Sequence, residues 1–97
     1  MSDIRTLNSG SPLAPINDPY KEPVRMSRRL REAIREHQKT TGLRFYQIAG
    51  RAGIDRSILS LLLHGKVVGK GDARLAKIGR WMEQQTGLPA DQWEEPA

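Results

Sequence analysis

The spacing of apolar residues predicts four helices after residue 27. In each of them apolar residues return every three or four positions, which places them on one face. The four stretches are residues 28–39, 45–52, 55–64 and 73–85. In the same order, their apolar faces are formed by Leu30, Ala33 and Ile34; by Ile48, Ala49 and Ala52; by Ile58, Leu59, Leu62 and Leu63; and by Leu75, Ile78, Gly79 and Met82. A helix with one apolar face must bury it against another element, so the pattern predicts a packed bundle.

A turn of three residues, Gly53, Ile54 and Asp55, separates the second and third predicted helices. Glycine readily takes the positive φ that ends a helix, and aspartate is a favoured N-cap. Ile54 is an apolar plug beneath the bend. Two helices joined by so short a turn cross steeply, so the start of residues 55–64 is expected to project from the body of the protein.

The two ends of the chain show different patterns. Residues 1–26 contain four prolines and no sustained period, which predicts a flexible N-terminal arm. Pro89 suits the first position of a helix, so we expect a short fifth helix that ends near Trp93. The expected fold is therefore all-α, with a helical domain over residues 27–97 after the arm.

Composition narrows the class of protein. The chain has 97 residues, which fits one domain, and a net charge of +5. It has no cysteine, so disulfides and thiolate metal sites are excluded. No apolar run is long enough to span a bilayer and no signal peptide is evident, so we expect a cytoplasmic protein without membrane contacts. Residues 27–71 carry ten Lys or Arg against three acidic residues. That concentration favours a polyanion such as DNA as a partner, although it also fits an ordinary solvated surface.

The run I-A-x-x-x-G-I-x-R-S-x-L-S, from Ile48 to Ser60, resembles the helix-turn-helix of Cro/CI repressor-like (XRE family) regulators. The resemblance covers roughly residues 27–88. It implies a lambda repressor-like four-helix bundle that binds double-stranded DNA as a homodimer, on a roughly palindromic operator. In the dimer, the C-terminal helix and Trp93 are the expected contact between subunits.

The resemblance implies a division of work among exposed side chains. Residues at the start of the recognition helix, 55–64, are expected to contact bases, and Arg56 can bond guanine in a bidentate way. Basic residues around that helix are expected to hold phosphates and fix the register on the duplex. The expected base contacts are Arg56, Ser57, Ser60 and Leu61, and the expected phosphate contacts are Arg44, Arg51, Lys66, Lys70 and His64.

Departures from the family support an alternative. Phe45 stands where the family usually has a glutamine, and Gln38 and Leu63 stand where a charged pair often lies. Together with the leucines of 61–63, Phe45 could form an apolar surface, which would suit a protein-binding module of antiactivator or antitoxin type. Such a module would hold its partner through the arm and the leucine-rich helix.

Enzymatic chemistry has little support in the sequence. His37 and His64 are the only histidines and fall on different predicted helices, with no carboxylates at metal-ligand spacing. No serine lies in a nucleophile-elbow context. We therefore expect neither catalytic activity nor a metal or cofactor.

Overall fold

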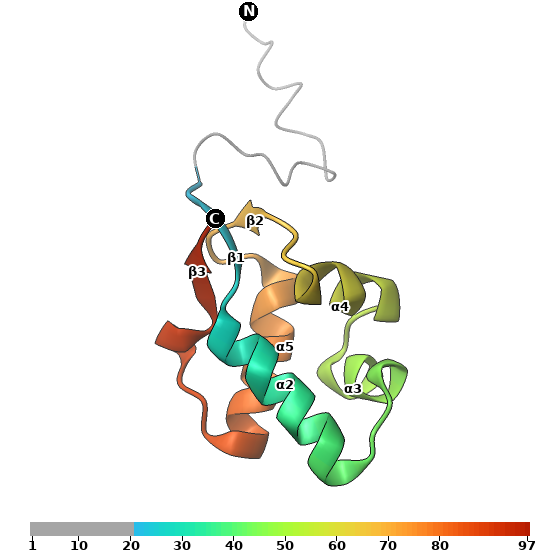
Figure 1. The fold of residues 1–97 in the computed structure, drawn as a ribbon. Coiled ribbons are helices and arrows are strands. Elements are labelled where there is room, and N and C mark those ends of the chain that lie inside the picture. Colours follow the sequence, from blue (N-terminus) through green and yellow to red (C-terminus); the bar gives the residue numbers. More distant parts are fainter. Residues whose placement is uncertain (1–20) are drawn as a thin grey trace, which may run out of the picture.

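A computed structural model describes residues 21–97, and these form four α-helices and a small antiparallel sheet (Figure 1). Residues 1–20, which include most of the expected arm, lie outside the described residues. In chain order the elements are β1 (Pro23–Met26), α2 (Arg28–Thr41), α3 (Phe45–Ala52), α4 (Arg56–Leu63), β2 (Val68–Gly69), α5 (Ala73–Thr86), the 3-10 turn η1 (Ala90–Gln92) and β3 (Glu94–Pro96).

The four predicted helices are confirmed, each within two residues of its expected ends. Local capping explains where they begin and end. The Ser27 hydroxyl accepts a hydrogen bond from the Leu30 N–H at 2.9 Å and opens α2. Asp72 accepts from the Arg74 and Leu75 N–H groups in the same way and opens α5. A glycine with positive φ follows each of the two long helices, Gly42 after α2 and Gly87 after α5.

The all-α prediction is wrong, because the chain also forms a three-stranded sheet in the order β2-β1-β3. Both neighbours of β1 run antiparallel to it, with Val24 opposite Val68 and Arg25 opposite Glu95. Side chains alternate along β1, so that Val24 and Met26 enter the core. Residues 23–26 therefore belong to the folded domain and not to the arm. Pro23 is tolerated because it stands first in its strand.

The core lies between α2, α5 and the α3–α4 pair, and the sheet closes one end of it (Figure 1). Every helix and two of the strands contribute buried side chains. Those that are almost fully enclosed include Met26, Leu30, Ile34, Ile48, Leu59, Leu62, Val68, Leu75, Ile78 and Met82. Leu43 packs against this cluster from the loop before α3.

Trp93 is seated within its own chain. The expected short turn after Pro89 is present as η1, and it delivers the indole onto α5 at Gly79. The indole Nε1–H points to the Leu88 carbonyl at 3.4 Å, and the Trp93 carbonyl accepts from the Ser27 N–H at 2.9 Å. These contacts connect the C-terminal segment to α5 and to the start of α2.

Glu95 compensates for an unfavourable charge at the start of α2. The first turn of that helix has no acidic residue but begins with Arg28 and Arg29, although the N-terminal end of a helix dipole favours negative charge. The Glu95 carboxylate accepts from the Arg28 N–H at 2.8 Å and from Arg25 Nε at 3.0 Å. These two bonds, the first above all, lower the pKa of Glu95 below its ordinary value of 4.5.

We expect this carboxylate to stabilise the fold only while it is ionised. Its pKa is lower in the folded than in the unfolded chain, so its contribution is present above pH 4.5 and is lost as pH falls through the folded pKa. Glu95→Gln should lower the free energy of unfolding at pH 7 by about 0.5–1 kcal/mol, a modest value because water screens the partly exposed group. Urea denaturation at pH 7 and pH 3 checks this. The prediction fails if the difference between variant and wild type is the same at both pH values.

Candidate nucleic-acid interface

The turn between α3 and α4 has the geometry that the sequence predicts. Gly53 has a φ of 84°, and its N–H and that of Ile54 both donate to the Ala49 carbonyl, at 2.9 and 3.0 Å. Ile54 is half-buried and packs against the core beneath the bend. The Asp55 backbone has the extended conformation of an N-cap. The turn thus fixes the direction in which α4 leaves α3.

The side chains of α4 divide cleanly between core and solvent. Leu59, Leu62 and Leu63 are buried, so two of the three leucines in the 61–63 run do not form the apolar surface expected of them. Leu61 is the exception, because 47% of it is exposed. The four residues predicted to contact bases, Arg56, Ser57, Ser60 and Leu61, are all exposed on the outward side of the helix, together with His64.

Ser57 is engaged differently from the prediction that it donates to a base or phosphate. The Asp55 carboxylate makes no capping bond to the backbone of α4 and instead accepts from the Ser57 hydroxyl at 3.2 Å. With its hydrogen directed to Asp55, the Ser57 oxygen is left as an acceptor. It can therefore receive a hydrogen bond from the amino group of adenine or cytosine, which both present one in the major groove.

The expected phosphate contacts on α3 are exposed. Arg44 stands at the N-cap, and Arg51 lies in the last turn. Gln47 Oε1 accepts from the Arg44 N–H at 2.8 Å and so caps the start of α3. The Arg44 side chain makes no ion pair within residues 21–97, and neither do those of Arg51 and Arg56.

The residues after α4 differ in how free they are. His64 is exposed, and its Nδ1 lies 2.7 Å from the Ser60 carbonyl, so Nε2 is the nitrogen left for a ligand. Lys66 is exposed just beyond the helix end. Lys70 is already partnered, because its Nζ lies 3.3 Å from Glu22 Oε1 and its N–H donates to the Glu22 carbonyl. Lys70 is therefore the weakest of the expected phosphate contacts.

Comparisons of this chain with protein-family models, with curated proteins and with solved structures found no match. The family resemblance thus rests on the residues from Ile48 to Ser60, and on how the fold presents them.

Sequence reasoning overlooked Tyr46, which is 54% exposed on α3. The signal was available, since Tyr46 falls on the opposite side of the helix from the buried Ile48. A tyrosine hydroxyl is a common donor to DNA phosphates. Phe45 beside it is 37% exposed, and Val67 after α4 is 40% exposed, so the surface around α4 mixes cations with apolar groups.

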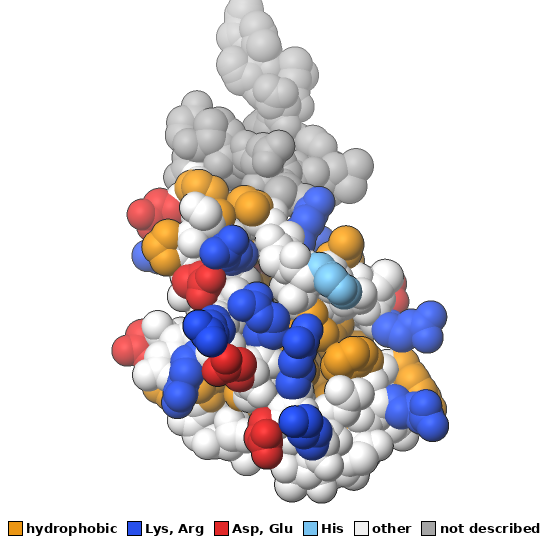
Figure 2. Space-filling model, viewed as in Figure 1, with side chains coloured by type: hydrophobic (Ala, Val, Ile, Leu, Met, Phe, Trp, Pro, Cys, Tyr) orange, Lys and Arg blue, Asp and Glu red, His pale blue; other side chains and the backbone are white. Residues whose placement is uncertain are grey.

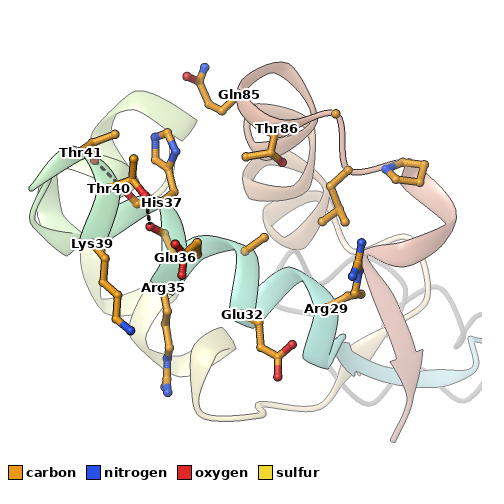
Figure 3. Close-up of a pocket in the computed structure, with 14 residues that line it drawn as sticks. Arg29, Glu32, Arg35, Glu36, His37, Lys39, Thr40, Thr41, Gln85 and Thr86 are labelled. Atoms are coloured by element: carbon orange, nitrogen blue, oxygen red, sulfur yellow. Dashed lines mark hydrogen bonds between the residues drawn. The ribbon is translucent and has the colours of Figure 1, made fainter.

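A hollow of the surface lies away from these residues. It is an open groove of about 930 Å³ between α2 and the end of α5 (Figure 3). His37 borders it and packs edge-on against Trp81, with ring centroids 5.2 Å apart. No cluster of three potential metal ligands occurs in the part of the chain that the structure describes. No helix there is long and apolar enough to cross a membrane.

Proposed function

We propose that this protein is a sequence-specific DNA-binding transcriptional regulator of Cro/CI type, acting in the cytoplasm with α4 as its recognition helix. The observation that carries the proposal is the exposed side of α4. This side begins with Arg56, directly after the turn that joins α3 to α4. The cations beside it have no acidic partners among the described residues. DNA recognition needs this combination of base-reading tips and phosphate-binding groups.

Each exposed residue of α4 has a base or phosphate chemistry that suits it. Arg56 offers a bidentate donor for guanine, and the Leu61 side chain offers an apolar contact for a thymine methyl group. Ser60 can act as donor or acceptor. Arg44, Arg51, Lys66 and His64 would hold phosphates on either side.

Two copies of the chain, related by a two-fold axis, would read half-sites about one helical turn of DNA apart. Because Trp93 packs on Gly79 of its own chain, we assign it no role between subunits.

The proposal is tested by selecting bound sites from random duplexes and then measuring the affinity for the most enriched duplex at several salt concentrations. Three phosphate contacts from Arg44, Arg51 and Lys66 predict that the slope of log affinity against log salt is about −2.7 per subunit or steeper, from release of counterions. The enriched duplexes should share a motif containing guanine. The proposal fails if no sequence is enriched over the starting pool.

A protein-binding module is the second candidate, favoured by the exposure of Phe45, Tyr46, Leu61 and Val67. Large apolar side chains gathered near one helix pair are typical of a protein interface. Leu61→Ser separates the two functions. If the chain regulates through DNA, this variant loses selectivity at one base position. If it is a protein-binding module, the variant loses its protein partner, and neither the variant nor the wild type enriches any duplex.

A further inference from the structure

The outer surface of α2 carries a row of four cations, Arg28, Arg31, Arg35 and Lys39, which we call the α2 stripe. The four residues recur every three or four positions, so they follow one side of the helix. The opposite side holds Leu30 and Ile34, which are fully buried. Arg28, Arg35 and Lys39 are exposed and Arg31 is half-buried, so most of the stripe faces away from the core.

The stripe is poorly neutralised by its own chain. Arg28 pairs with Glu32 at 3.0 Å, but both side chains remain mostly exposed. Within residues 21–97, Arg31, Arg35 and Lys39 form no ion pair. Like charges four residues apart on a helix destabilise it by about 0.2–0.5 kcal/mol, and the pairs Arg31–Arg35 and Arg35–Lys39 are both of this kind. A polyanion laid along the stripe would remove this repulsion.

The stripe lies on the same face of the molecule as the candidate interface. Figure 2 shows Lys and Arg side chains over α2 and, further along the same face, over α3 and α4. In Figure 3 the side chains of Arg35 and Lys39 extend from one side of α2, away from His37 and from Thr86 at the end of α5. Arg35 and Lys39 also border the groove between α2 and α5, and the stripe prolongs the basic surface around α4.

We propose that the α2 stripe binds the sugar-phosphate backbone of the same duplex that α4 reads, in addition to the contacts from α3 and α4. This inference rests on the proposed DNA-binding function. Side chains one helical turn apart have Cβ atoms about 5–6 Å apart, so a row of them can meet successive phosphates of one strand. Such contacts carry no sequence information, and the stripe is expected to add affinity without adding selectivity.

The double variant Arg35→Gln/Lys39→Gln tests the stripe. Glutamine keeps the helix propensity and removes two charges. With the duplex selected by the wild-type chain, the slope of log affinity against log salt should become shallower by about 1.8 per subunit, which is the loss of two phosphate contacts in each subunit. The ratio of affinities for selected and random duplexes should stay unchanged. Arg35→Gln alone should give about half of this shift, and thermal melting monitored by circular dichroism confirms that both variants fold.

Lys77→Gln/Arg80→Gln is the matched control, because both residues are exposed on the side of α5 opposite its buried face and the change in net charge is the same. Its salt slope should stay within a few tenths of that of the wild type. The inference is overturned if the α2 variant and this control have equal slopes, or if the α2 variant loses binding of an acidic protein and none of DNA. In either case a loss of selectivity in Arg56→Ala would leave the proposed function standing, so the two failures are distinguishable.

Discussion

Replacing Arg56 with alanine is expected to lower the ratio of affinities for the selected operator and for random duplex by about 5- to 150-fold, or about 1–3 kcal/mol. A bidentate contact between arginine and guanine discriminates against the wrong base by that amount. Arg56 is exposed at the first position of α4 and makes no ion pair with any residue between 21 and 97, so its guanidinium is free for a base. Competition binding with labelled operator and unlabelled random duplex measures the ratio.

Two further variants sharpen this test. Arg56→Lys keeps the charge but lacks the planar fork of the guanidinium, so it should retain the salt dependence of binding and still lose much of the selectivity. Arg80→Ala removes an exposed arginine from α5 and should change the ratio little. Equal selectivity in Arg56→Ala and Arg80→Ala would mean that Arg56 reads no base.

Gly79→Ala is expected to destabilise the fold by about 1–3 kcal/mol, because a methyl group at this position has no room. Its Cβ would overlap Cδ2 and Cγ of the Trp93 indole, which rests on α5. To accept the methyl group, Trp93 has to move, and with it the link to Ser27 at the start of α2. Urea denaturation gives the free energy of unfolding.

Gly50→Ala is the matched control for this prediction. Gly50 lies inside α3, is exposed, and a Cβ there meets no atom within 4 Å. Alanine is a better helix former than glycine, so this variant should gain about 0.5–1 kcal/mol. A second check combines Gly79→Ala with Trp93→Leu. The smaller side chain leaves space for the methyl group, and the loss in the double variant should be clearly less than the sum of the two single losses.

The sequence was sufficient to predict the helices because each of them has its own local signals. Apolar spacing defined α2, α3, α4 and α5, and Gly53 predicted the turn between α3 and α4. The strands had no such signal. Two to four residues are too few to show alternation, and Pro23 together with Pro96 reads as a break. Pairing between residues about seventy positions apart, such as Arg25 and Glu95, cannot be read from local pattern.

The candidate interface was predictable in its position and less so in its bonds. The exposure of Ser57, Ser60 and Leu61 follows from the helical period, which turns them away from Leu59 and Leu62, whereas Arg56 is exposed at the first position of α4. By contrast, the bond between Ser57 and Asp55 depends on a side-chain rotamer, and the ion pair between Lys70 and Glu22 depends on how β1 meets β2. Tyr46 was missed because apolar spacing describes only the buried face of α3, and Tyr46 lies outside that face.

The position of β1 between β2 and β3 has a consequence for synthesis of the chain. Val24 and Met26 leave the ribosome early, but the strand that covers the second edge of β1 is made about seventy residues later. The contacts between α3 and α4 are local, and local contacts form faster than distant ones. We therefore expect a nascent chain to form the α3–α4 turn first, while β1 waits for β3 with an unpaired edge. This intermediate would be protected from pairing with other chains if polar groups covered the open edge of β1, or if residues 27–93 were translated rapidly.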